Sequence, residues 1–449
     1  MRVGLPSVLS MAMGRRLFPN VYEGWIVVGS AAFIMLAMSA SFFYGFGTIF
    51  TEVIDEFGWS VAATSLAFSL RSEVGGIAAP FVGVLIDRLG PRRVMIGGLL
   101  VSAAGIVIMS LIQEIWHFYV AMLVIAVGSS AAGGQVGLVA VATWFEERRA
   151  RAMSFMTIGG GLGGLLVVGI AAMVEMMGWR VALQVIGAFM ATVGVFVALN
   201  IRGRPLNHPQ PMDGIRYADD DIIPEPAVRW GIPVRTVLKS RPFLLLAIGM
   251  SLYAFGSTTF VVHQIPYLEK DIGVSKAVAS TSVAAFTVFS IVGRLGFGII
   301  ADRFPKTAVL AVSTGMVVVG LVVLALANNF VTAMIAILII SPGFGGSIPV
   351  RPAMLADYFG TKHFGTINGL GSLIMTTGGA IGPWFVGRVV DVTGHYEFGW
   401  FVTAAVTALA IPLFLASKPP VALAAEARRL AELEPRTEGG PDMTTAGGH

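Results

Sequence analysis

The chain has 449 residues, of which 55% are hydrophobic and only 12% are charged. Soluble globular proteins carry about 25% charged residues, so these proportions argue against a water-soluble fold. The formal net charge is +4, but the basic residues are spread over many short segments. Because of this distribution, we expect no nucleic-acid partner. Because the chain has no cysteine, disulfides and thiolate metal sites are excluded.

Long apolar segments recur along the whole chain, separated by short polar stretches. A bilayer core about 30 Å thick is crossed by roughly 20 apolar residues in a helix that rises about 1.5 Å per residue. We therefore predict an all-α membrane protein with twelve transmembrane helices. Their predicted ranges are 25–50, 61–86, 94–112, 118–143, 153–176, 181–201, 243–268, 277–301, 308–327, 331–355, 366–390 and 398–415.

Lys and Arg indicate the orientation, because positive residues are retained on the cytoplasmic side of a membrane. With the N-terminus inside, the segments on that side carry most of the 30 Lys and Arg residues. The opposite segments carry only Arg180, Lys270, Lys276 and Arg388. We predict a multi-pass protein of the cell (inner, cytoplasmic) membrane with both termini in the cytoplasm.

A polar stretch rich in Pro, Asp and Arg divides the chain at 202–241. Such a composition cannot cross a bilayer, so we interpret it as a cytoplasmic linker with at most one surface helix. The predicted organisation is a six-helix half at 1–201, the linker at 202–241, a second six-helix half at 242–418 and a cytoplasmic tail at 419–449.

The two halves form an internal repeat at an offset of about 215 residues. Two parallel six-helix repeats around a shared cavity are the architecture of carriers that rock one half against the other. The matched features are GVLIDR at 83–88 with GIIADR at 298–303, Trp144-Phe145 with Tyr358-Phe359, and Gly178 with Gly394.

The segment that follows the second predicted helix resembles the loop signature of the major facilitator superfamily, which implies that fold for residues 25–415. A carboxylate among cations at a helix end can pair with a neighbouring helix in one state and release it in another, so we predict a gating latch. Positive residues that only set the orientation of a helix in the membrane would explain the arginines. They would not explain the fixed spacing of the Gly and Asp residues or its recurrence in the second half. The predicted latch residues are Gly83, Asp87, Arg88, Gly90, Arg92, Arg93, Asp302 and Arg303.

Two further segments narrow the resemblance. EGW at 23–25 opens the first predicted helix, and WFEERRARA at 144–152 opens the fifth, followed by GGG at 159–161. Both resemble signatures of the monocarboxylate transporter family and its bacterial relatives, including oxalate-formate exchangers. Inside-positive arginines and helix-packing glycines occur in many membrane bundles, so we expect structural roles for both segments.

Ionisable side chains inside apolar segments are the best functional candidates, because a charge held there is costly. Arg294 in the eighth helix has no acid at i±3 or i±4, and its guanidinium matches a planar carboxylate. The family resemblance implies that this arginine holds the carboxylate of a substrate. The alternative is a structural ion pair with an acid on another helix, such as Glu73.

Arg71 and Glu73 in the second helix point about 200° apart, so they do not pair within the helix. For Arg71, substrate binding and structural pairing stay open. Glu73 is a candidate for proton coupling or, alternatively, a fixed partner of Arg294 or Arg71. At the outer end of the seventh helix, His263 is a candidate for substrate binding and proton coupling.

Gln264 and Tyr44 are further candidates for substrate binding. Alternatively, His263 and Gln264 are ordinary polar residues at the end of a helix, and Tyr44 is an aromatic residue packed at the membrane interface. The sequence departs from the family at Ser290, where monocarboxylate carriers commonly have aspartate, and it has no lysine in the first helix. These two departures argue against proton coupling through an aspartate and a lysine at these positions. No Lys or Arg occurs between Gly369 and Gly387, which favours a monocarboxylate, although Arg71 could supply a second charge.

We predict a secondary active transporter that moves a small organic anion, a monocarboxylate first of all, by alternating access with a coupled proton or counter-solute. The alternatives are an efflux carrier for an apolar or cationic compound and a nontransporting membrane sensor. The expected surroundings are the lipid bilayer, and the expected state is a monomer. No catalytic set emerges, so we expect neither enzymatic activity nor a metal or cofactor.

Overall fold

The computed structural model describes residues 21–41, 45–205, 212–214 and 229–433. In these residues the chain forms helices and no strand. The N-terminal half comprises α2 (Glu23–Ser39), α3 (Phe46–Phe57), α4 (Val61–Leu89), α5 (Pro91–Ser110), α6 (Ile115–Ala132), α7 (Gly134–Ala142), α8 (Arg149–Leu162), η2 (Gly163–Leu166), α9 (Val167–Phe189), η3 (Met190–Gly194) and α10 (Val195–Ala198).

The C-terminal half is more regular, because most of its spans are single unbroken helices. It comprises α12 (Arg241–Lys270), α13 (Lys276–Ala301), α14 (Lys306–Ala325), α15 (Phe330–Phe359), α16 (Phe364–Thr393), α17 (Glu397–Ala408) and α18 (Ala410–Ala416). Three short elements lie outside the two halves: η4 (Met212–Gly214), α11 (Val234–Lys239) and α19 (Val421–Leu433).

All twelve predicted segments coincide with helix in the described part of the chain. Within that part, nine helical segments are long and apolar enough to cross a membrane. The other three predicted spans are helical too: the first is divided into α2 and α3, the second is α4 with charged residues in its interior, and the fifth is interrupted by η2. The predicted all-helical membrane fold is confirmed.

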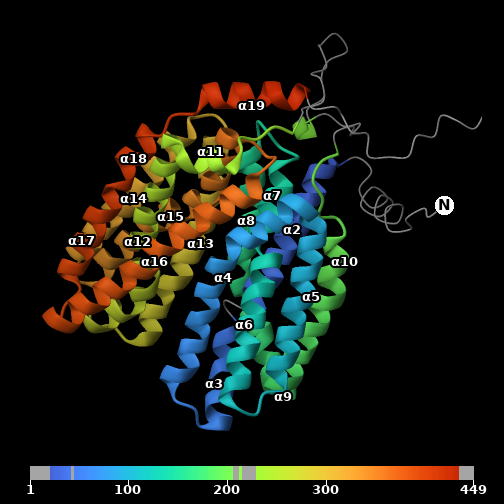
Figure 1. Cartoon of the computed structure of the whole chain (residues 1–449). Coiled ribbons are helices and arrows are strands. Elements are labelled where there is room, and N and C mark those ends of the chain that lie inside the picture. Colours follow the sequence, from blue (N-terminus) through green and yellow to red (C-terminus); the bar gives the residue numbers. More distant parts are fainter. Residues whose placement is uncertain (1–20, 42–44, 206–211, 215–228, 434–449) are drawn as a thin grey trace, which may run out of the picture.

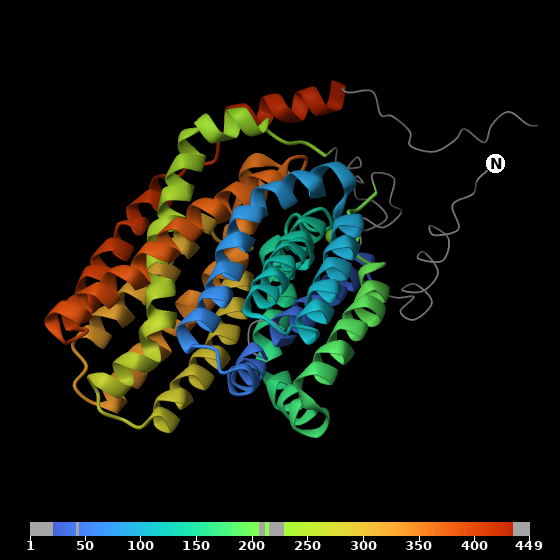
Figure 2. The same ribbon diagram turned by 60° about the horizontal axis from the view of Figure 1, so that its bottom comes forward.

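The two halves form separate bundles that lie side by side (Figures 1 and 2). Across the interface, α4 packs against α16 and α8 packs against α13. We call the end of the molecule that carries α11 and α19 the linker end. Figure 1 shows the bundles in contact near this end and diverging toward the opposite one.

Glycines allow the close approach of the two bundles. A Cβ at Gly83 on α4 would lie 2.2 Å from the carbonyl oxygen of Gly365, and one at Gly298 on α13 would lie 1.8 Å from the Oγ of Ser154. Only a residue without a side chain fits at such spacings. Gly83 and Gly298 are equivalent positions of the repeat, so both interface contacts follow from one repeated feature.

The signature segments at 23–25 and 144–152 pack against each other at the linker end. The Trp25 and Phe145 rings have centroids 4.9 Å apart, and Tyr22 donates a hydrogen bond from its hydroxyl to the Trp144 carbonyl at 2.8 Å. Gly24 makes room, because a Cβ there would lie 3.0 Å from the Phe145 ring. These contacts agree with the structural role expected of both segments.

Candidate functional site: a cavity between the halves

A cavity of about 430 Å³ lies between the two halves. Residues of α2, α4, α6 and α8 line it on one side, and residues of α12, α13 and α15 line it on the other. Its walls are largely apolar with a few polar groups, which is typical of sites for small molecules. The polar side chains in the lining are Ser39, Arg71, Ser129, Gln264, Thr287, Ser290 and Arg294.

Arg294 extends from α13 to the opposite half. Its Nη1 donates a hydrogen bond to the backbone carbonyl of Thr157 on α8. Gly161 leaves room for this contact, because a Cβ there would lie 3.3 Å from Nη1. Ser290 lies one turn earlier on the same face of α13, and its buried Oγ has no hydrogen-bond partner among the described residues. Together the two side chains can offer a cation and a hydroxyl to a ligand.

Arg71 lines the same cavity from α4, in the other half. The structure therefore brings two predicted arginines, one from each half, to a single cavity. Glu73 lies two residues further along α4, but its side chain is outside the described part of the structure. Tyr44 also lies outside the described residues. Their suggested roles stay predictions.

His263 and Gln264 point to different surroundings although they are neighbours in sequence. Gln264 lines the cavity and donates to the Oγ of Ser282 at 2.7 Å. His263 instead has its Nε2 2.9 Å from the carbonyl oxygen of Pro383 and its Nδ1 3.2 Å from the hydroxyl of Tyr396. A carbonyl can only accept, so Nε2 carries the hydrogen, and in the neutral ring Nδ1 accepts from Tyr396. The geometry therefore brings Gln264 to the cavity and ties His263 to α16.

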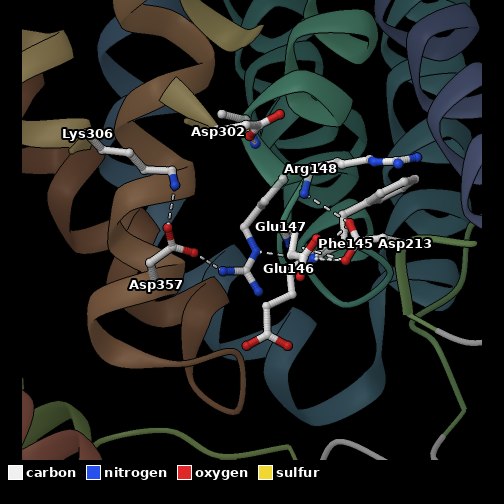
Figure 3. A network of polar contacts seen from close by, with 10 residues as sticks. Phe145, Glu146, Glu147, Arg148, Asp213, Asp302, Lys306 and Asp357 are labelled. Atoms are coloured by element: carbon white, nitrogen blue, oxygen red, sulfur yellow. Dashed lines mark hydrogen bonds and ion pairs between the residues drawn. The ribbon is translucent and has the colours of Figure 1, made fainter. Parts of the chain in front are cut away.

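At the linker end, Asp302 binds the first turn of α8 in the opposite half. Its carboxylate accepts hydrogen bonds from the backbone N–H groups of Ala150 at 3.0 Å and Arg151 at 3.3 Å, and the Nε of Arg151 lies 3.5 Å away. A helix N-terminus has unpaired N–H groups and a partial positive charge, so a carboxylate is stabilised there. Figure 3 shows Asp302 facing the segment that leads into α8.

Asp87 makes the reciprocal contact from the N-terminal half. It accepts from the backbone N–H groups of Gly365 at 2.9 Å and Thr366 at 2.8 Å, and from the Thr366 hydroxyl at 2.6 Å, at the start of α16. The repeat offset that relates Asp87 to Asp302 also relates Ala150 to Gly365. Two repeat-related aspartates thus each hold the helix N-terminus of the other half. Their release during a transport cycle stays a prediction.

The other predicted latch residues surround these contacts, and Gly83 packs against Gly365 of the opposite half. Gly90 has φ +82° and turns the chain from α4 into α5. Arg92 donates from Nε to the Ile201 carbonyl of its own half at 3.4 Å. The side chains of Arg88, Arg93 and Arg303 are exposed.

Sequence reasoning missed an ion-pair cluster beside Asp302. Asp357 on α15 pairs with Arg149 on α8 and, at 2.7 Å, with the Nζ of Lys306 on α14 (Figure 3). The Arg149 pair joins the two halves. The available signals were weak: Asp357 directly precedes the repeat anchor Tyr358-Phe359, and Arg149 lies in the signature at 144–152.

The linker supplies a second carboxylate that was not predicted. Asp213 in η4 is buried and accepts hydrogen bonds from three consecutive backbone N–H groups, those of Glu146, Glu147 and Arg148, at 3.0 to 3.2 Å (Figure 3). Its φ of +60° is in the left-handed region that aspartate tolerates better than most residues. This contact attaches the linker to the segment that leads into α8.

The Asp302 contact is expected to depend on pH. Burial raises the pKa of Asp302 to about 6, outweighing its hydrogen bonds, whereas a hydrated aspartate has a pKa of about 3.9. A proton therefore binds more tightly when the halves are closed, so closure is favoured below about pH 4 and weakened as pH rises through 6. We expect the closed population to increase roughly ten-fold relative to the open one between pH 7 and pH 5.

Spin labels at Leu89→Cys and Phe304→Cys can measure this change, because both side chains are exposed at equivalent positions of the two halves. The chain has no cysteine of its own, so both labels are specific. Electron paramagnetic resonance distances should shift at pH 5 toward the short component, which represents the closed linker end, and Asp302→Asn should reduce this dependence. An unchanged pH response in Asp302→Asn would contradict the assignment.

Two repeated helical halves, a cavity between them and reciprocal contacts at one end are the architecture of membrane transporters built from parallel repeats. The family model of the Major Facilitator Superfamily matches residues 32–266 and 246–439. The chain belongs to this superfamily, and it is a multi-pass membrane protein.

The relatives agree with the resemblance seen in the sequence. Monocarboxylate transporter 13 of Bos taurus is 26% identical over 392 residues, which cover 86% of this chain and 87% of the relative. The oxalate:formate antiporter of Oxalobacter formigenes is 23% identical over 384 residues, with coverage of 84% and 87%. The crystal structure of the superfamily transporter FucP in the outward conformation has a TM-score of 0.68 at 16% identity, with coverage of 88% and 98%. The likeness to FucP shows the fold alone.

Proposed function

We propose that this protein is a secondary active transporter that carries a small organic anion, a monocarboxylate first of all, by alternating access. One observation carries the proposal: Arg294 of one half and Arg71 of the other line the same cavity. A guanidinium offers paired N–H donors that match a carboxylate, and the attraction strengthens where water is excluded. The names of the relatives support the same class of substrate.

The hydrogen bond of Arg294 suggests how binding drives the cycle. Its Nη1 donates to Thr157 of the opposite half in the present arrangement. A carboxylate competes with that carbonyl for the same donor, so substrate binding exchanges a contact between the halves for a contact with the cargo. A ligand shifts a conformational equilibrium only through such differential interactions. Binding at Arg294 therefore weakens the closed linker end.

The direction of opening follows from the same contacts. The reciprocal aspartate contacts and the Arg149–Asp357 ion pair join the halves at the linker end, which we assign to the cytoplasmic face with both termini. The arrangement then corresponds to a carrier closed toward the cytoplasm. Coupling to a proton or a counter-solute belongs to this proposal, with Glu73 and His263 as its candidate groups.

Flux measurements on the purified full chain in liposomes test the function. We expect saturable uptake of at least one of radiolabelled acetate, lactate, pyruvate and oxalate, with competition among the monocarboxylates. Uptake of tetraphenylphosphonium that is lost in Glu73→Gln, without carboxylate uptake, would instead indicate a cation efflux carrier. Saturable carboxylate binding without any flux would indicate a sensor.

A further inference from the structure

A second cavity of about 180 Å³ adjoins the first. Met35, Gly134 and Ile348 line both, so the two spaces share a wall. The second cavity lies nearer the linker end, because Leu355 and Asn368 in its lining are four residues from the linker-end termini of α15 and α16. A helix rises about 1.5 Å per residue, so these residues lie about 6 Å from those termini.

Arg351 on α15 is the cation of this second cavity. Its Nε donates to the Ser347 carbonyl at 3.1 Å, its Nη1 contacts the sulfur of Met375, and its guanidinium lies 5.9 Å from the centre of the Tyr253 ring. A carbonyl, a thioether and an aromatic face orient a cation without neutralising it. Among the described residues, no carboxylate forms an ion pair with Arg351.

The remaining polar groups of the lining suit a carboxylate as well. Asn368 and Ser372 from α16 and Gln135 from α7 share the cavity with Arg351. Gln135 donates from Nε2 to the Ala79 carbonyl of its own half at 3.1 Å and to the Gly365 carbonyl of the opposite half at 3.2 Å, so opening of the linker end releases one N–H of this amide. Thr157 lines the second cavity, and its carbonyl accepts the hydrogen bond of Arg294. The release of Arg294 from Thr157 therefore occurs at the boundary between the two cavities.

We propose that Arg351 forms a second anion-binding position, which receives the carboxylate of the cargo from the Arg294 cavity as the linker end opens. The inference rests on the proposed function, because it takes the same carboxylate as its ligand. The cargo then passes two arginines in sequence. The second position sets the linker-side KM, which is the KM for cargo that enters from the linker end.

Protection of a single introduced cysteine tests this directly. Ser372→Cys adds a near-isosteric thiol to the second cavity of a chain that has no other cysteine. We expect an anionic methanethiosulfonate reagent to modify it in inside-out vesicles of the full chain. Lactate, pyruvate, acetate or oxalate, whichever the wild type transports, should slow the reaction at least about five-fold. Arg351→Gln should abolish that protection and raise the linker-side KM about ten-fold.

Arg235→Gln, which removes an exposed arginine on α11, is the matched control and should keep the protection. Arg351→Met keeps the bulk of the side chain without its charge and replaces Arg351→Gln should that variant not fold. Unchanged protection and unchanged linker-side KM in these Arg351 variants would overturn the second position while leaving the proposed function intact. Absence of carboxylate flux in the wild type would overturn the proposed function, and the second position with it.

Discussion

Arg294→Gln is expected to lower carboxylate uptake by at least about 100-fold. The change removes a charge and a paired donor from the cavity, and each hydrogen bond to a charged group contributes roughly 1.5–3 kcal/mol. Arg294→Lys keeps the charge but loses the planar arrangement of donors, so we expect an intermediate loss of about 10-fold. Initial rates of radiolabelled lactate or pyruvate uptake into liposomes measure both effects.

Arg388→Gln is the matched control, because Arg388 is an exposed arginine on α16 and is not part of the cavity. It should transport at close to the wild-type rate. Gel filtration and thermal unfolding of each variant separate a loss of function from a loss of fold. Normal uptake by a folded Arg294→Gln variant would exclude this arginine as the substrate-binding group.

Gly83→Ala is expected to prevent closure of the linker end. Its Cβ would lie 2.2 Å from the Gly365 carbonyl oxygen and 2.9 Å from the Thr366 Cα, both of them backbone atoms that cannot rotate away. The two helices must then separate, which also breaks the hydrogen bonds of Asp87 with Gly365 and Thr366. We expect the distance between labels at Leu89→Cys and Phe304→Cys to shift to the long component, and uptake to fall at least about 10-fold.

Gly97→Ala serves as its control, because a Cβ at Gly97 on α5 meets nothing within 4 Å. This variant should keep both the wild-type distance distribution and the wild-type flux. A short distance component retained in Gly83→Ala would show that the backbones can adjust, and that close packing at this glycine does not limit closure.

The sequence predicted regular spans well and interrupted spans less well. The predicted ranges 94–112 and 277–301 differ by only a few residues from α5 and α13, because a run of apolar residues specifies a membrane helix locally. The predicted span 25–50 is instead divided into α2 and α3. A Cβ at Gly163 in η2 would lie 2.8 Å from the backbone nitrogen of Ala40, so this end of α2 meets another helix at close range. Hydropathy carries no information about such a contact.

In the candidate site too, local sequence predicted some residues, whereas others became apparent only from contacts between helices. Arg294 and Arg71 were found in the sequence because charged residues stand out in apolar segments. Arg351 also lies in such a segment, yet no pattern in the sequence connected it with a cavity. The ion pair of Asp357 with Arg149 joins residues that are 208 positions apart in the sequence, so sequence spacing could not indicate it.

The sequence alone determined the membrane class, the two-fold repeat and the family, because apolar length, charge distribution and repeated motifs are properties of local segments. Only the tertiary structure decided which charges face a shared cavity and which tie the halves together. The side chains that tie the halves together meet partners on helices of the other half, and helix packing sets that pairing. In this chain, packing brings Arg71 and Arg294 to one cavity and directs Asp87 and Asp302 to opposite helix N-termini.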